Sequence, residues 1–500
     1  MKSLPQLRTS LTHPLQIAEV QPFLGAGRVG ITFCPGKKQP KAATGAWDRD
    51  LDLDLDAVAA WNAAAVVTLI EDHELTALKT EGMGAKVAAR HMAWFHLPIG
   101  DYSVPPVSFE RQWTEVGEGL RARLRAGFNV LVHCKGGLGR AGTIASRLLI
   151  ELGMEPKAAV QAVRTARPGA IETDAQLAYV MAQKPVPEAE PAATAEAIKD
   201  RATGALLGLA VGDAIGTTLE FKARDSYPLL TDMVGGGPFG LKPGEWTDDT
   251  AMALALADSL ALDPKLDEKD LMRRFVEWHE KGTYSCTGRC FDIGITTRQA
   301  LGRWKKSGDP FAGSTDPQTA GNGSLMRLAP VAVRHWQDRA LLRDVAARQS
   351  RTTHGAPEAV DGCVAYAEAL ADAIEGRKRS EVLRDRLEPY AGAIASIMAG
   401  SWRGKQRKAI RASGYVAHSL EASLWSVART GSFAEAVLLA ANLGEDADTT
   451  GAIAGQLAGA VYGADAVPSR WCRTVAWSDS IIDATRALFA ASEYRPLRQS

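Results

Sequence analysis

The chain has 500 residues, more than one ordinary domain holds, so two or three domains are expected. Its 58 basic side chains balance its 58 acidic ones, which gives no charge argument for nucleic acid or an anionic membrane as the main partner. Six scattered cysteines, with no signal-peptide core and no apolar run of the ~18 residues that a membrane span needs, favour a cytoplasmic protein without a membrane partner.

Residues 1–25 are predicted to be a loosely structured lead-in, and residues 26–184 are the first predicted domain. Short apolar, β-branched segments alternate there with helical patterns. The predicted strands cover residues 29–33, 65–70, 94–99 and 128–133, and a long helix is predicted over 109–126. This alternation predicts an α/β domain with a mainly parallel sheet flanked by helices.

The last of these strands leads directly into a glycine-rich loop that begins at Cys134 and ends at Arg140. A loop between a strand and a helix can turn its N–H groups inward and bind an anion. A cysteine at its base is expected to be a thiolate nucleophile, and Arg140 can offer two hydrogen bonds to phosphate. The alternative is a buried structural cysteine. The predicted substrate-binding residues of the loop are Lys135, Gly136, Gly137, Leu138 and Gly139.

This loop resembles the phosphate loop of cysteine-dependent phosphatases. Residues 25–180 resemble the dual-specificity branch close to the kinase-associated phosphatases (cyclin-dependent kinase inhibitor 3-like), through Cys34-Pro35-Gly36, Arg49-Asp50-Leu51, Leu97-Pro98-Ile99-Gly100-Asp101 and the loop itself. The resemblance implies that Cys134 attacks phosphorus and that Asp101 protonates the leaving oxygen and then activates water. It also implies that Arg140 stabilises the transferred group. No cofactor is implied.

One residue departs from the phosphatase pattern. The family usually has Ser or Thr directly after the arginine, where this chain has Ala141. That hydroxyl assists departure of the thiolate from the phosphocysteine, so slow turnover is expected. Thr143 could substitute for it.

A Pro/Ala/Glu-rich segment, residues 185–198, is the predicted linker. From residue 199 to 500 helical periodicity runs nearly throughout, which predicts a compact all-α domain. Within it a helix over 202–214 has glycines at every fourth position, and the segment 451–459 repeats that spacing. The two glycine faces are expected to form the tight centre of the domain.

Two acidic clusters stand out in the helical part. Thr247-Asp248-Asp249-Thr250 and Asp446-Ala447-Asp448-Thr449 each open a helix of small or apolar residues. The aspartates of either cluster could simply cap a helix. Together, however, four carboxylates need compensating positive charge, and neither cluster contains a lysine or arginine. Two oxygen-preferring divalent cations satisfy that need.

Residues 199–490 resemble the ADP-ribosylglycohydrolase family, which includes the dinitrogenase reductase-activating glycohydrolases and the ADP-ribosyl-acceptor hydrolases. The shared motifs are Gly212-Asp213-Ala214 with Glu220-Phe221, Trp246 to Thr250, Phe291-Asp292-Ile293-Gly294, Gly321 to Arg327, Thr353-His354, and Asp446 to Gly451. The resemblance implies an all-α bundle around two Mg²⁺ or Mn²⁺ ions. The metal-ligand positions it assigns are Thr247, Asp248, Asp249, Asp446, Asp448 and Thr449.

The resemblance also supplies roles around the ribose. A carboxylate must act as acid or base at the anomeric carbon, and Asp292 is favoured for this over Glu220, which is given a gating or water-orienting role. The loop Gly321-Asn322-Gly323-Ser324 is expected to offer N–H groups to the pyrophosphate. His354 is expected to contact the ligand, the alternative being a satisfied buried histidine.

The sequence therefore predicts a bifunctional hydrolase that acts on an ADP-ribosylated protein or small molecule and on a phosphorylated protein or small molecule. In a second interpretation the phosphatase half is a weakened phospho-binding module. In a third the whole chain is an ADP-ribose-sensing regulatory protein. The acceptor atom, the choice between Mg²⁺ and Mn²⁺, the identity of the acid/base and the oligomeric state stay open.

Overall fold

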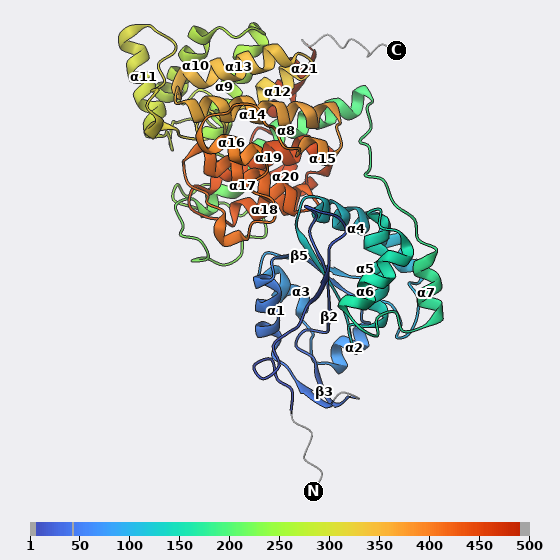
Figure 1. The fold of residues 1–500 in the computed structure, drawn as a ribbon. Coiled ribbons are helices and arrows are strands. Elements are labelled where there is room, and N and C mark those ends of the chain that lie inside the picture. The colour runs from blue at the N-terminus through green and yellow to red at the C-terminus, as the bar shows by residue number, and fades with distance from the viewer. Residues whose placement is uncertain (1–6, 43–44, 491–500) are drawn as a thin grey trace, which may run out of the picture. The chain divides into compact units, whose positions relative to one another are not determined.

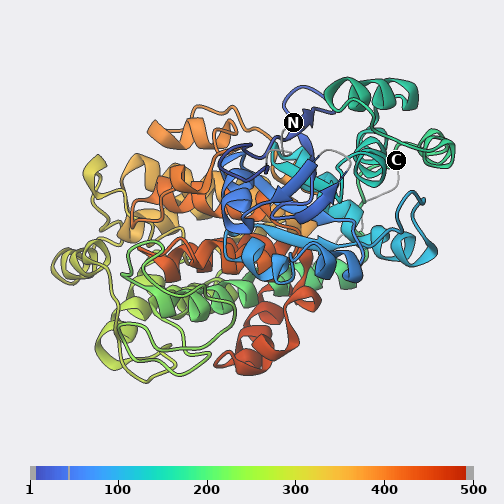
Figure 2. The same ribbon diagram turned by 90° about the horizontal axis from the view of Figure 1, so that it is seen from below.

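The computed structural model of the protein describes residues 7–42 and 45–490. The chain folds into two compact units that meet in sequence at Ala189 and Glu190. Strands occur only in the blue-to-cyan part of Figures 1 and 2, and the remaining described residues form helices and loops. The predicted architecture, an α/β unit followed by an all-α unit, is confirmed.

The first unit holds a five-stranded sheet with the order β1-β2-β7-β5-β6, in which only β1 is antiparallel to its neighbour. A separate hairpin joins β3 to β4. The elements are β1 (Ala18–Val20), β2 (Val29–Phe33), β3 (Lys38–Ala42), β4 (Gly45–Asp48), α1 (Leu51–Ala60), β5 (Ala63–Thr68), α2 (Asp72–Ala77), α3 (Met83–Ala88), β6 (Ala93–His96), α4 (Val107–Arg125), β7 (Asn129–Cys134), α5 (Gly139–Glu151), α6 (Pro156–Ala166) and α7 (Asp174–Met181).

All four predicted strands are present, and β7 lies in the middle of the sheet. Its residues Val130, Leu131 and Val132 are fully buried, since helices cover both faces of a mainly parallel sheet. Cys134 ends β7 and pairs in register with Phe33 of β2. The phosphate loop thus begins at the carboxyl edge of the sheet, where ligands of α/β folds bind.

The prediction of a loosely structured lead-in was wrong in part. Residues 18–20 form β1, which hydrogen-bonds to β2 and extends the sheet at its edge. The first six residues of the lead-in lie outside the described residues, as do 491–500 of the predicted second domain. A strand of three residues with intermediate or exposed side chains has no hydrophobic pattern by which the sequence could reveal it.

The second unit consists of helices α8 to α21 with short 3₁₀ turns. They are α8 (Ala195–Gly216), η1 (Thr217–Leu219), α9 (Asp248–Leu262), α10 (Glu268–Lys281), α11 (Ile295–Ser307), η2 (Pro317–Thr319), α12 (Ala329–His335), α13 (Arg339–Thr353), α14 (Pro357–Glu375), α15 (Arg379–Val382), α16 (Gly392–Met398), η3 (Arg407–Ala409), α17 (Val416–Arg429), α18 (Phe433–Ala441), α19 (Ala447–Tyr462), η4 (Ala464–Ala466), α20 (Ser469–Thr474) and α21 (Ser478–Ala490). Helix α8 starts inside the segment predicted as linker.

The two glycine faces pack against each other, as predicted. A Cβ atom built on Gly208 of α8 would lie 2.2 Å from the carbonyl oxygen of Gly455 in α19, and one on Gly455 would lie 2.0 Å from the carbonyl oxygen of Gly208. The backbones are therefore in direct contact, and no larger residue fits. This contact fixes α19, whose first turn carries Asp448 and Thr449, against the centre of the bundle.

Substitution of Gly208 by Ala is expected to destabilise the helical unit by about 3 kcal/mol, because the added methyl group meets backbone that cannot move aside. The control is Gly302→Ala in α11, where a Cβ would meet nothing within 4 Å. That change should stabilise the unit by about 0.5–1 kcal/mol. Urea unfolding followed by circular dichroism measures both. Equal stability of the two variants would contradict the close packing.

Helix α8 also corrects a second prediction. The span Ala195–Leu219 is long and apolar enough to cross a membrane by length and composition, so the statement that no such run exists was wrong. However, 94% of the apolar 18-residue stretch within it is buried inside the protein. A central helix of a bundle is apolar on every side for the same reason that a membrane helix is.

Candidate functional site

The two acidic clusters of the second unit lie together. Thr247 directly precedes α9, and Asp446 directly precedes α19. The Thr247 hydroxyl lies 3.4 Å from an Asp448 carboxylate oxygen, and the Thr449 hydroxyl lies 3.4 Å from Asp249. Two helix starts about two hundred residues apart therefore build one acidic centre.

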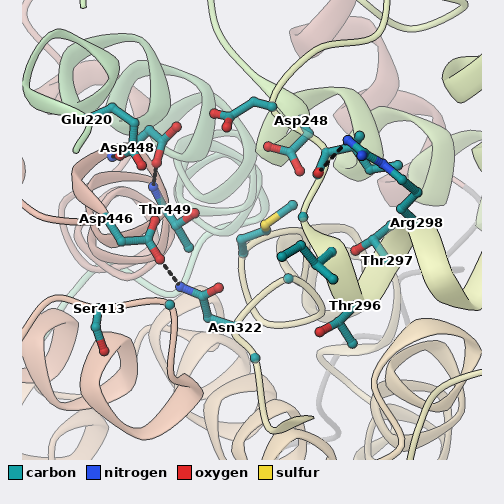
Figure 3. A pocket seen from close by; sticks show the side chains of 18 of the residues that line it. Glu220, Asp248, Thr296, Thr297, Arg298, Asn322, Ser413, Asp446, Asp448 and Thr449 are labelled. Atoms are coloured by element: carbon teal, nitrogen blue, oxygen red, sulfur yellow. Dashed lines mark hydrogen bonds between the residues drawn. The ribbon is translucent and has the colours of Figure 1, made fainter. Parts of the chain in front are cut away.

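This centre opens into a cavity of about 860 Å³ (Figure 3). Of the residues predicted for the site, its lining includes Glu220, Asp248, Asp292, Gly321, Asn322, Gly323, His354, Asp446, Asp448 and Thr449. Thr247 and Asp249 are buried beside it. Ser324 does not line the cavity: its hydroxyl is fully buried and shares a 2.8 Å hydrogen bond with Ser350.

A buried aspartate that the sequence analysis left without a role organises the start of α9. The Asp213 carboxylate, fully buried in α8, accepts hydrogen bonds from the backbone N–H and hydroxyl of Thr247 and of Thr250 at 2.6–3.1 Å. It holds the first turn of α9 so that Asp248 faces the cavity. The Gly-Asp-Ala motif was the only signal in the sequence, and it did not reveal this function.

The acidic centre is electrostatically uncompensated. Burial first, and then repulsion from neighbouring carboxylates, raises the pKa values of Glu220, Asp248, Asp249, Asp292 and Asp446 above those of ordinary carboxyl groups. Among the described residues, no lysine or arginine forms an ion pair with them, and Asp249 Oδ1 is buried without a hydrogen-bond partner. Such an oxygen-rich, anionic donor set fits divalent cations such as Mg²⁺ or Mn²⁺.

Glu220 is closer to this centre than the predicted ligand set assumes. Oxygen atoms of Glu220, Asp446 and Asp448 lie within 4.8 Å of one another, which is close enough to share a metal ion. Glu220 also accepts hydrogen bonds from the N–H groups of Ala447 and Asp448, at 2.7 and 3.3 Å. These bonds fix its carboxylate at the start of α19, so any gating motion would have to break them.

The far wall of the cavity combines the glycine loop with His354. The Asn322 side chain donates to Asp446 at 2.8 Å (dashed in Figure 3) and thereby orients that carboxylate. The His354 ring lies against Gly323, where a Cβ would come within 2.7 Å of it. Burial, with a smaller contribution from Arg327, lowers the pKa of His354 to about 3, so the ring is neutral.

The phosphate loop of the first unit follows β7. The Cys134 sulfur accepts a hydrogen bond from the Gly137 N–H at 3.2 Å, and Gly137 has the left-handed φ of +70° that the turn requires. The Arg140 guanidinium is buried, and it lies 3.0 Å from a carboxylate oxygen of Asp101, which is half-exposed. The structure thus brings the predicted acid to the predicted loop.

Two glutamates at this loop come from segments without a recognisable motif. Glu74 pairs with Arg140 and, with the Ile99 carbonyl, orients its guanidinium. Burial alone would raise the pKa of Glu74, but the hydrogen bonds from Arg140 and from a backbone N–H outweigh it and hold that pKa below its ordinary value. Glu172 accepts the Gly139 N–H at 2.7 Å. This N–H, predicted to bind substrate, therefore already has a carboxylate partner.

Lys37 is a buried cation near the loop. Its amine lies 4.5 Å from the Trp47 ring centre and 3.5 Å from the Lys135 carbonyl oxygen, and its side chain is almost inaccessible. Burial lowers the pKa of Lys37 from 10.5 to about 8. The unfolded chain therefore holds this proton more tightly than the folded one between these two values, and stability rises with pH in that window.

Replacement of Lys37 by Met is expected to stabilise the first unit at pH 7 by on the order of 1–3 kcal/mol. The gain should shrink as the pH rises from 8 to 10.5. Unfolding measured at several pH values tests this, with Lys38→Met as control, because the Lys38 side chain is 44% exposed and its amine pairs with Asp48. A gain that does not change with pH would contradict the expectation.

Comparison with known proteins identifies both units. The family model described as ADP-ribosylglycohydrolase matches residues 194–497. The chain belongs to the ADP-ribosylglycohydrolase family. A second model, described as a Swiss Army Knife protein, DSP-PTPase phosphatase domain, matches residues 48–180. The chain thus joins a phosphatase domain to an ADP-ribosylglycohydrolase domain, as the sequence motifs predicted.

The relatives of the ADP-ribosylglycohydrolase domain are similar over most of their own length. "ADP-ribosylarginine hydrolase Tri1" of Pseudomonas putida (strain GB-1) is 48% identical over 59% of this chain and 80% of the relative. "ADP-ribosyl-[dinitrogen reductase] glycohydrolase" of Rhodospirillum rubrum is 35% identical over 56% and 91%. A solved structure, "ADP-ribosylglycohydrolase-related protein complex", is 39% identical with a TM-score of 0.52, and covers 59% of this chain and 99% of its own.

Proposed function

We propose that the helical domain hydrolyses the N-glycosidic bond between ADP-ribose and an arginine side chain, and that it uses two divalent metal ions, Mg²⁺ or Mn²⁺. The observation that carries this proposal is the buried acidic cavity, which is suited to cations and to a positively charged acceptor. The arginine acceptor is further supported by two relatives, 48% and 45% identical, whose names specify ADP-ribosylarginine.

The residues that would hold the metal ions are Thr247, Asp248, Asp249, Asp446, Asp448 and Thr449, with Glu220 as an additional carboxylate beside them. Bound divalent ions would supply Lewis-acid binding of the ribose hydroxyls and of a water molecule. Asp213 and Asn322 do not belong to this set. They orient its members through the hydrogen bonds to Thr247 and to Asp446.

The reaction adds water across the bond between C1″ of the ribose and the guanidinium nitrogen. The hydroxyl of water goes to C1″, and its proton ends on the nitrogen that leaves. A carboxylate in the cavity takes the proton from water and passes it on. We assign this step to Asp292, which has a left-handed φ of +60° and lines the cavity. We assign the orientation of water to Glu220, whose carboxylate is fixed at the start of α19.

The proposal is tested by incubating the full chain with ADP-ribosylarginine and measuring ADP-ribose release. EDTA treatment should abolish release, and Mg²⁺ or Mn²⁺ should restore it. ADP-ribosylserine, O-acetyl-ADP-ribose and ADP-ribosylated nucleic acid are compared in parallel. If no substrate releases ADP-ribose but the protein binds ADP-ribose tightly, the proposed hydrolase is wrong and the protein is an ADP-ribose sensor.

We also propose that the first unit hydrolyses phosphomonoesters through a phosphocysteine on Cys134. The contact between Asp101 and Arg140 supports this, because it puts an acid beside the expected position of the leaving group. Turnover of para-nitrophenyl phosphate, lost in Cys134→Ser, is the expected result. Binding of phosphate without turnover would favour the phospho-binding module instead.

A further inference from the structure

Three phenylalanine rings stand at one edge of the acidic cavity. The ring centres of Phe221 and Phe239 are 6.3 Å apart, and those of Phe239 and Phe291 are 5.3 Å apart. Phe221 and Phe239 line the cavity, and Phe221 is 68% exposed. A large aromatic side chain that is mostly exposed at the edge of a polar cavity, with one ring neighbour, loses the stabilisation that burial would give.

The backbone at Phe221 is also unfavourable for a phenylalanine. Its φ is +59°, in the left-handed region that residues with a Cβ rarely adopt. Two backbone hydrogen bonds to Glu445 hold this segment: the Phe221 N–H donates to the Glu445 carbonyl at 2.7 Å, and the Glu445 N–H donates to the Lys222 carbonyl at 2.8 Å. Strain that is maintained in this way, with an exposed ring as its result, indicates a function of that ring.

The charge around the rings specifies the chemistry of what they bind. Six carboxylates line the cavity against one cationic side chain, Arg298; they are Glu220, Asp248, Asp292, Glu445, Asp446 and Asp448. Phe221 directly follows Glu220 in the chain, and Phe291 directly precedes Asp292. Glu220 and Asp292, the two carboxylates assigned to the cleaved bond, line the same cavity as Phe221 and Phe239.

We propose that Phe221 and Phe239 form an aromatic wall that binds the guanidinium plane of the acceptor arginine. This inference rests on the function proposed above and adds the determinant of its acceptor specificity. A guanidinium is planar, delocalised and weakly hydrated, so it stacks on an aromatic face while its N–H groups reach neighbouring carboxylates. A serine or acetyl acceptor carries no positive charge, and it therefore gains little from the wall.

The test compares the kinetics of ADP-ribosylarginine hydrolysis with the inhibition constant of ADP-ribose, which lacks the acceptor. Phe221→Leu keeps the apolar bulk and removes the π face, whereas Phe221→Tyr keeps the π face. We expect Phe221→Leu and Phe239→Leu to raise KM by about 3- to 30-fold. Phe221→Tyr should stay within about twofold of the wild type, and the ADP-ribose inhibition constant should change in none of them by more than about twofold.

The inhibition constant also reports correct folding of each variant. Leu387→Ala, at a side chain 82% exposed and outside the cavity lining, controls for loss of apolar surface and should change neither constant. If Phe221→Leu has the KM of the wild type, or if its ADP-ribose inhibition constant rises as much as its KM, the aromatic wall is wrong. Neither result would contradict the proposed hydrolysis. A wild-type protein that releases no ADP-ribose from ADP-ribosylarginine would overturn the proposed function, and the wall with it.

Discussion

Asp448→Asn is expected to lower the rate of ADP-ribose release from ADP-ribosylarginine by at least about 100-fold, because loss of even an indirect partner of a metal ligand typically costs 10- to 100-fold. Asp448 is 2% exposed and lies at the junction of both acidic clusters. After burial, repulsion from Asp448 is the largest cause that raises the pKa of Glu220, Asp292 and Asp446. No other carboxylate of the centre raises the pKa of so many neighbouring carboxyl groups.

The same substitution is expected to stabilise the metal-free protein, because it removes a buried like charge. In EDTA the melting temperature should rise by about 2–5 °C, whereas in Mg²⁺ the wild type should be the more stable protein, since only it gains fully from ligand binding. Asp479→Asn, an exposed aspartate of α21, should change neither value. If Mg²⁺ leaves the wild-type melting temperature unchanged, the proposal of a metal centre is wrong. If Asp448→Asn retains full activity, Asp448 has no role in it.

Local patterns in the sequence predicted the elements that carry chemistry. The buried strand β7 and the loop from Cys134 to Arg140 form one continuous segment, so hydrophobicity, glycine spacing and residue type all indicate the same structure. The two acidic clusters could be assigned to one site from the sequence for a different reason. Neither contains a lysine or arginine to neutralise its carboxylates, so both need metal ions. The packing of Gly208 on Gly455 followed from their spacing of four along two helices.

Contacts that depend on the third dimension could not be predicted in this way. Glu74 lies in a short helix and Glu172 in the loop before α7. Neither segment has a sequence pattern that predicts its contact with the phosphate loop. Ser324 belongs to a glycine-rich motif that suggests ligand binding, yet its hydroxyl bonds to Ser350. The left-handed backbone at Phe221 is visible only as a dihedral angle, because sequence patterns predict glycine or asparagine there.

Cys134→Ser is expected to lower phosphatase activity by at least about 10³-fold, as removal of a nucleophile does in other hydrolases. The Cys134 sulfur lies at the base of the loop, within hydrogen-bond distance of the Gly137 N–H. A serine hydroxyl can take the same bond but is a much weaker nucleophile. Turnover of para-nitrophenyl phosphate by full-length protein measures the loss, and ADP-ribose release by the same sample confirms that the other domain is intact. Retained phosphatase activity would exclude Cys134 as nucleophile.

Ala141 determines which step should limit the wild-type phosphatase. It is fully buried directly after Arg140, and the nearby Thr143 hydroxyl donates to the Gly139 carbonyl at 2.8 Å, so its hydrogen is already used within the helix. Without a hydroxyl to assist the departing thiolate, breakdown of the phosphocysteine is expected to be slow. Rapid-mixing kinetics should show a burst of nitrophenol followed by slow turnover. Ala141→Ser should raise the rate of the slow steady-state phase by about 10-fold and leave the rate of the burst unchanged. A wild type without a burst would mean that formation of the phosphocysteine, controlled by Asp101 and Arg140, is the slow step instead.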